Sequence, residues 1–147
     1  MSHTFTQNYI HLIFSTKERA RTISKDVQPN LWAYMAGICQ NHEMVSRAIG
    51  GIDDHAHLLF HLPATLSLSK AANLIKANSS KWMKDYAKDF EWQLGYAGFS
   101  VSTSNLASVE KYICNQGSYH KKIAFKEEYL SLLKKHNVKY DPRYVLG

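Results

Sequence analysis

Three histidines alternate along a strand-like run, IDDHAHLLFHLP, at residues 52–63. Because successive side chains of a strand point to opposite faces, His55, His57 and His61 share one face. The other face is continuously apolar and suits packing against helices. Its residues are Ala56, Leu58, Phe60 and Leu62. Two imidazoles at positions i and i+2 of a strand can bind one metal ion together, although so short a pattern also fits a pair of half-exposed histidines without a ligand.

Tyr112 and Gln116 stand four residues apart in the segment YICNQ, which has helical character. Residues at this spacing lie one turn apart on the same face of a helix. The amide oxygen of Gln116 can complete a metal site with two histidines, and the Tyr112 phenol can then attack a phosphate that the metal polarises. Taken alone, Tyr112 is more typical of an aromatic residue that packs its ring on the sheet and keeps its hydroxyl outward.

The hydrophobic periodicity predicts the elements that position these residues. Strands are expected at 8–15, 43–49, 53–62 and 96–103, and helices at 26–42, 67–89, 104–116 and 125–137. Gly50 and Gly51 are expected to form the tight turn of a hairpin between the second and third strands. This order is that of an α+β, ferredoxin-like βαββαβ fold, in which helices cover one face of an antiparallel sheet. The histidine face would then be the free one, beside a catalytic helix with Tyr112 and a C-terminal helix.

The bulk properties describe one domain, residues 1–147, with a single sizeable core. Eighteen Lys and Arg against 12 Asp and Glu give a net charge of +6, which attracts nucleic acid but equally fits a solvated basic surface. No apolar run approaches the roughly 20 residues that span a bilayer, and we see no secretory leader. Cys39 and Cys114 have neither metal-binding nor redox spacing, so we expect buried free thiols in a reducing cytoplasm.

Three segments in this order resemble one family: DHAHLL, EWQLGYAGFSVS and VEKYICNQGSYHKK. They are similar to the small single-tyrosine transposases of the HUH nuclease superfamily, of the insertion-sequence 200/605 type. The similarity extends over nearly the whole chain, from YIHLIFSTKERART through LIKANSSKWM to FKEEYLSLL. Two positions depart from the family pattern. Ala56 replaces a larger apolar residue between the histidines, and Tyr119 stands where a histidine is expected.

The resemblance implies a DNA transposase that nicks and rejoins single-stranded DNA at the ends of a mobile element. His55, His57 and Gln116 would bind a divalent ion, Mg²⁺ or Mn²⁺, and Tyr112 would form a 5′-phosphotyrosine intermediate. The ligand chemistry leans towards Mn²⁺, since Mg²⁺ prefers all-oxygen shells. The family also implies a DNA hairpin near the cleaved ends and a homodimer, in which Tyr112 serves its own or the partner's histidines. Neither a membrane nor a small-molecule substrate is implied.

Basic residues near the predicted site are candidates for DNA contacts. Phosphates would bind cationic side chains, and unpaired bases would stack on aromatic rings. The candidates are Arg47, Lys76, Lys81, Lys111, His120, Lys121 and Lys122. Trp82 and Tyr119 are weaker candidates for stacking, and His61 is expected to flank the site. Each lysine is equally compatible with a solvated surface.

Two other classes of function fit parts of the sequence. A hydrolytic zinc enzyme could use His55, His57 and His61, but the strand rise separates the first from the last by ~20 Å. The main alternative is a non-catalytic single-stranded nucleic-acid-binding protein of ferredoxin-like fold, including a domesticated transposase. Such a domain would carry stacking aromatics on its central strands, where this sequence has histidines.

Overall fold

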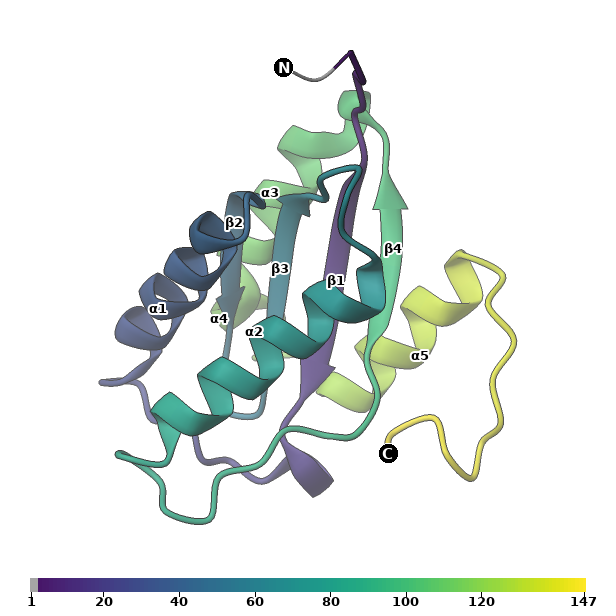
Figure 1. The fold of residues 1–147 in the computed structure, drawn as a ribbon. Helices are drawn as coiled ribbons and strands as arrows, with labels where there is room; N and C mark the ends of the chain where they lie inside the picture. Colours follow the sequence, from purple (N-terminus) through teal and green to yellow (C-terminus); the bar gives the residue numbers. More distant parts are fainter. Residues whose placement is uncertain (1–2) are drawn as a thin grey trace.

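The computed structural model describes residues 3–147, which form a four-stranded sheet with helices on both faces (Figure 1). The strands are β1 (Tyr9–Ser15), β2 (Val45–Gly51), β3 (His55–His61) and β4 (Ala97–Val101). The helices are α1 (Gln28–Asn41), α2 (Leu68–Met83), α3 (Leu106–Cys114), α4 (Gln116–Tyr119) and α5 (Phe125–Lys135). Short 3-10 turns occupy Lys17–Arg19 and Thr103–Asn105. Within residues 3–147, no helix is both long and apolar enough to cross a membrane.

The sheet has the strand order β2-β3-β1-β4, and every pair of neighbours is antiparallel. The prediction of an α+β fold with an antiparallel sheet is therefore confirmed. The β1–β3 register pairs Ser15 with His55 and Ile13 with His57. Because directly opposed residues point to the same face, His11 of β1 shares the face of His55 and His57.

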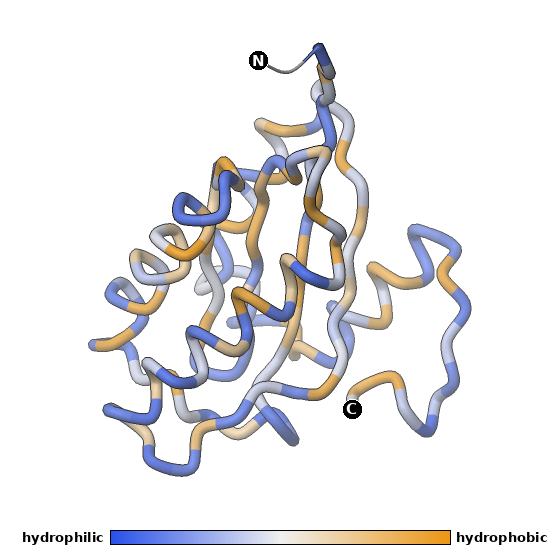
Figure 2. The backbone as a smooth tube through the Cα atoms, viewed as in Figure 1, coloured by the Kyte–Doolittle hydropathy of each residue, from blue (hydrophilic) through white to orange (hydrophobic). Residues whose placement is uncertain are grey.

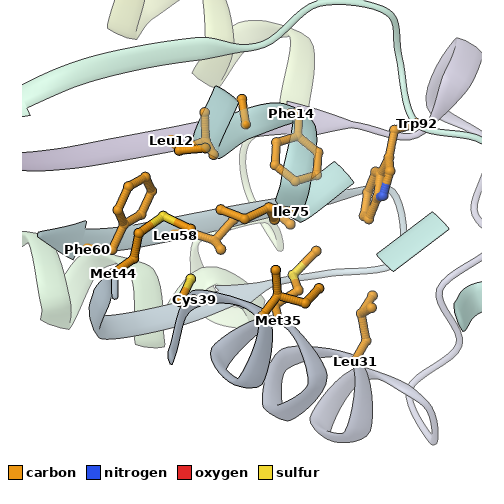
Figure 3. Packing of buried hydrophobic residues seen from close by; sticks show 14 of the residues in the cluster. Leu12, Phe14, Leu31, Met35, Cys39, Met44, Leu58, Phe60, Ile75 and Trp92 are labelled. Carbon is orange, nitrogen blue, oxygen red and sulfur yellow. The ribbon is translucent and has the colours of Figure 1, made fainter. Parts of the chain in front are cut away.

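α1 and α2 cover the opposite face and bury the larger hydrophobic core (Figures 1 and 3). Leu12 and Phe14 of β1 join Leu58 and Phe60 of β3 in this core, together with Ile75 of α2. Figure 2 shows hydrophobic residues recurring along these central strands. The predicted apolar face of β3 is confirmed by this packing.

Local signals account for where the helices begin. The Ser67 hydroxyl accepts a hydrogen bond from the backbone N–H of Lys70 (3.1 Å) and so caps α2. Pro29 lies in the first turn of α1, where a missing N–H costs no hydrogen bond. α5 has acidic residues in its first turn and basic residues in its last, which complements the helix dipole.

The histidine face is not free, contrary to the sequence-based expectation, because α3 and α5 cover its two sides. α3 packs on β2 and β3 through one hydrophobic cluster, and α5 packs on β1 and β4 through another. The first cluster contains Ala48, Leu59, Leu106 and Ile113, and the second contains Ile13, Ala97, Phe99, Phe125, Tyr129 and Leu133. The central strands carry His11, His55 and His57 between these clusters, and all three are buried.

Three local predictions were wrong. Gly50 and Gly51 belong to β2, and residues 52–54 make the turn. The predicted helix over 104–116 is interrupted at Asn115 (φ −101°, ψ 19°), so Gln116 begins α4. Cys114 is exposed rather than buried, because it lies on the outer side of α3. Cys39 is buried in the core as predicted, and burial raises the pKa of its thiol to about 12.

Gly50 is needed where α3 crosses β2. A Cβ atom at this position would lie 2.7 Å from the backbone oxygen of Ile113. We expect Gly50→Ala to lower the free energy of unfolding by about 1–3 kcal/mol, as overpacking does elsewhere, in urea denaturation. Gly37→Ala in α1 is the matched control, since its added methyl group would have no atom within 4 Å. It should instead be neutral or stabilising by about 0.5–1 kcal/mol, and an unaffected Gly50→Ala protein would contradict the packing argument.

Candidate active site

Polar side chains from four elements converge on the histidine face between α3 and α5. They are His55 and His57 of β3, Tyr112 of α3, Gln116 of α4, His120 directly after α4, and Glu128 of α5. One ligand atom from each of His55, His57, His120 and Glu128 lies within 4.8 Å of the others. His55 and His57 are fully buried, and Gln116 and Glu128 are about 1% exposed. The site is therefore an interior cluster, and Tyr112 and His120 form its half-buried edge.

His55 and His57 are oriented by hydrogen bonds to their Nδ1 atoms, on the side of each ring away from the cluster. Nδ1 of His55 donates to the Asp54 carboxylate (2.8 Å), and Nδ1 of His57 is 2.8 Å from Nε2 of His11. Both Nε2 atoms consequently point into the cluster. Metal-binding histidines are typically fixed in this way, with one ring nitrogen held by a neighbour and the other available to the ion.

Glu128 lies at the centre of the cluster, although no motif or spacing in the sequence indicates a role for it. Its Oε1 is 3.2 Å from Nε2 of His57, 3.0 Å from Nε2 of His120 and 3.4 Å from Nε2 of His55. Its Oε2 accepts hydrogen bonds from the amide of Gln116 (3.0 Å) and from the hydroxyl of Tyr112. Burial alone would raise the pKa of Glu128, but hydrogen bonds from His120 and His57 outweigh it and hold the pKa well below its usual range. The carboxylate is therefore charged.

The same contacts keep the Tyr112 phenol protonated. Burial raises the pKa of Tyr112 well above its ordinary value, and the neighbouring Glu128 charge raises it further. Burial also lowers the pKa of His57 to about 4, so that its imidazole is neutral near pH 7. A neutral imidazole is the form that binds metal ions.

The donor set fits a divalent transition metal better than it fits Mg²⁺. Three imidazole nitrogens, one carboxylate and the Gln116 amide oxygen, which is 2.8 Å from Nε2 of His55, face one another. Imidazole ligands suit Fe²⁺, Ni²⁺, Cu²⁺ and Zn²⁺ and bind Mn²⁺ more weakly, whereas Mg²⁺ favours an all-oxygen shell. The charge of Glu128 and the fixed imidazoles both favour a cation at this position.

The structure brings together four residues that the sequence analysis assigned to the site: His55, His57, Tyr112 and Gln116. His120 was predicted to contact DNA, but its Nε2 is 2.9 Å from Oε1 of Gln116, inside the cluster. His61 lies at the far end of β3, where its Nε2 is 3.1 Å from the Thr6 carbonyl oxygen. The three-histidine zinc site therefore does not form.

The basic residues predicted to contact DNA fall into two groups. Lys111 and Lys122 line a cavity of about 630 Å³ that also borders Tyr112 and Tyr119, which we call the lysine cavity. Lys121 borders a separate cavity of about 660 Å³ beside His120. Both cavities border α4, where Ser118 lines each of them.

Arg47, Lys76 and Lys81 have different surroundings. Arg47 pairs with Glu110 of α3 and lies 5.8 Å from the ring centroid of Tyr9. Lys81 is exposed on α2, on the opposite side of the sheet from the histidines. The Lys76 ammonium donates to the backbone oxygens of residues 93, 94 and 95 at 2.7–3.0 Å, and burial lowers its pKa to about 8. Lys76 thus secures the loop before β4 and is not a free cation for DNA.

Trp82 packs partly against the core and stacks on Tyr34, with ring centroids 5.2 Å apart and planes at 17°. This agrees with a packing position on the helix side of the sheet, away from the histidine cluster.

Residues 4–116 match the family described as "Transposase IS200 like". The chain belongs to this family. Two solved structures share the fold: a Deinococcus radiodurans R1 protein provisionally described as a transposase, and a REP-associated tyrosine transposase bound to a REP hairpin. The first has a TM-score of 0.63 at 21% identity, covering 79% of this chain and 96% of its own. The second has a TM-score of 0.61 at 15% identity, covering 84% of this chain and 76% of its own. Among curated proteins none matches this sequence.

The family match ends at Gln116, yet the site does not. His120 and Glu128 reach the cluster from residues beyond the matched part. No spacing rule relates Glu128 to the histidine pair, and an acidic pair in a first helical turn is ordinarily explained by the helix dipole. Only the packing of α5 against the sheet reveals its position in the site.

Proposed function

We propose that this transposase-family protein nicks and rejoins single-stranded DNA, with Tyr112 as the nucleophile. The observation that carries the proposal is the carboxylate that Tyr112 shares with the imidazoles. The Tyr112 hydroxyl donates to Oε2 of Glu128, while His57 and His120 contact its Oε1. The Tyr112 hydroxyl is thus linked through one carboxylate, that of Glu128, to the imidazoles that would bind a metal ion. This arrangement supports covalent catalysis at a phosphate better than it supports a purely structural tyrosine.

We assign the divalent ion, Mn²⁺ or Mg²⁺, to His55, His57 and Gln116, with His120 and Glu128 as additional ligands. When bound, this ion supplies Lewis acidity that draws charge from the phosphate oxygens. Tyr112 leaves its contact with Glu128 and its oxygen bonds to phosphorus, while the bond from phosphorus to the 3′-oxygen breaks. The phenol loses its proton as the new bond forms, and the departing 3′-oxygen takes up this proton, so that none is gained or lost. Oε2 of Glu128, which the Tyr112 hydroxyl contacts, is placed to carry it between the two oxygens.

The product of this step is a 5′-phosphotyrosine and a free 3′-hydroxyl. A 3′-hydroxyl from another DNA end reverses the step and releases Tyr112. Each transfer exchanges one phosphodiester for another, so no nucleotide triphosphate is required, and the sequence has no Gly-rich phosphate loop.

We further propose that the DNA backbone lies along the α3–α4 segment. The lysine cavity, which Tyr112 borders, offers Lys111 and Lys122 as cations, and Lys121 borders the cavity beside His120. Arg47 is a weaker candidate because it already pairs with Glu110. Lys81 is weaker because it lies on α2, on the other side of the sheet from the cluster. The related REP-associated tyrosine transposase is bound to a REP hairpin, which supports a DNA hairpin as the recognition element here. A homodimer and a cytoplasmic location remain predictions.

A covalent-adduct assay tests the proposal. Labelled single-stranded DNA from both flanks of the encoding gene is incubated with the protein and Mn²⁺, then separated on a denaturing gel. We expect a slower band that protease removes and that EDTA prevents. If the protein binds the DNA but forms no adduct with any of the divalent ions tested, the result would instead support the non-catalytic nucleic-acid-binding alternative.

A further inference from the structure

A cavity of about 400 Å³ opens between α3 and α5 beside β4. We call it the α3–α5 cavity. Its lining residues that matter here are Phe99 of β4, Asn105 before α3, Tyr112 and Ser108 of α3, and His136 after α5. None of the steps proposed for Tyr112 and the metal ligands uses this cavity. Its volume is near the lower end for small-ligand sites, about 300–1,000 Å³, which suits one ring system rather than a duplex.

The α3–α5 cavity borders the proposed nucleophile directly and the metal site through His11. Tyr112 contributes to its wall, and so does His11, whose Nε2 is 2.8 Å from Nδ1 of His57. Tyr112 and Ser108 also line the lysine cavity. The nucleophile therefore stands on a ridge with a small cavity on one side and a cavity bordered by cations on the other.

The lining of the α3–α5 cavity suits a flat ring with polar edges. The His136 ring stacks on Phe99, with centroids 4.1 Å apart and planes at 19°. Nδ1 of His136 donates to the Leu132 carbonyl (2.9 Å), which fixes the ring, while His136 itself is exposed. Because His136 is exposed and also lines the cavity, its ring is accessible to a further ring. Hydroxyl and amide groups of Ser102 and Asn105, with the Lys135 ammonium, supply donors and acceptors around it.

We propose that the α3–α5 cavity binds the base of a nucleotide next to the cleaved phosphate and so selects the cleavage position. The inference rests on the proposed function, because single-stranded DNA is the substrate. Nucleobases combine stacking faces with hydrogen-bonding edges, which is the combination that this lining offers. With the base in this cavity and the backbone towards the lysine cavity, the phosphate between them lies at the Tyr112 ridge.

An abasic scan tests this proposal. Oligonucleotides from the gene flanks each carry one abasic nucleotide, and their binding to Tyr112→Phe protein is measured by fluorescence anisotropy. We expect one position to weaken binding roughly 5- to 150-fold, the range for loss of one stacked base, and neighbouring positions to have smaller effects. Where wild-type protein forms an adduct, that position should lie within two nucleotides of the cleaved phosphate.

Two cavity variants and a control complete the test. His136→Ala removes the stacking face, and Asn105→Trp fills the cavity from an exposed position that does not border the lysine cavity. Each variant is combined with Tyr112→Phe. In each combination, the loss of DNA affinity caused by the abasic nucleotide should shrink to less than twofold, as in a double-mutant cycle. Ser131→Ala on the exposed side of α5 should retain it in full. Equal effects at all positions, or an undiminished effect in both cavity variants, would overturn the proposal.

The two proposals fail in different ways. If wild-type protein forms no adduct but one abasic position still weakens binding in a His136-dependent manner, the base site stands and the nucleophile assignment fails. If the adduct forms but no position is distinguished, the base site is wrong and the proposed function stands.

Discussion

Tyr112→Phe is expected to abolish the covalent protein–DNA adduct while leaving single-stranded DNA binding within about threefold. Phenylalanine keeps the ring and its contacts with His11 and His57 but removes the oxygen that would bond to phosphorus. Loss of a nucleophile typically lowers turnover by about 10³-fold or more, so the band should fall below detection. Adduct formation is read on a denaturing gel, and binding is read by fluorescence anisotropy with the same labelled DNA.

Tyr119 provides the most demanding comparison for this experiment. Its ring centroid is 5.4 Å from that of Tyr112, which makes it the neighbouring phenol most able to substitute for the proposed nucleophile. Tyr119→Phe should still form the adduct, and the exposed Tyr86→Phe should behave as wild type. An adduct that persists in Tyr112→Phe but disappears in Tyr119→Phe would transfer the assignment to Tyr119.

Glu128→Gln is expected to weaken Mn²⁺ binding at least tenfold. The substitution preserves the shape of the side chain and an oxygen that can accept from Tyr112, but it removes the only carboxylate in the ligand cluster. A carboxylate gives a divalent cation both a ligand atom and a compensating charge, whereas an amide gives the ligand atom alone. Isothermal titration with Mn²⁺ and no DNA measures this affinity directly and does not depend on catalysis.

Glu127 provides the matched control for Glu128. It precedes Glu128 in the first turn of α5 but is exposed, so Glu127→Gln changes the net charge and the helix terminus equally. We expect Glu127→Gln to bind Mn²⁺ within twofold of wild type. Equal affinities for both variants would show that Glu128 does not contribute to metal binding.

The strands were predictable because their side chains alternate in a way that only one register satisfies. In β3, Leu58 and Phe60 enter the core while His55 and His57 face the other side. The glycine pair was misread for a physical reason. Gly50 meets the backbone of α3, a contact between distant segments, and local sequence does not distinguish such a position from a turn.

The candidate site was predictable only in part. His55 and His57 belong to one strand, and Tyr112 and Gln116 are four residues apart. Local spacing therefore predicts that the two side chains of each pair share a face. Glu128 joins them because α5 folds back over β1 and β4, a consequence of tertiary packing. The same packing explains why the histidine face is buried, although alternation alone predicted a free surface.

The residue that carries DNA can be identified directly in the adduct, and this measurement tests the proposed chemistry at its centre. The adduct is treated with nuclease and trypsin, and the peptides are fragmented in a mass spectrometer. Trypsin is expected to release residues 112–121, a peptide that contains both Tyr112 and Tyr119, so fragment ions must separate the two. We expect a phosphonucleotide on Tyr112 joined through the 5′-phosphate of the DNA. A nucleotide on Tyr119, on another residue, or joined through a 3′-phosphate would contradict the proposed mechanism.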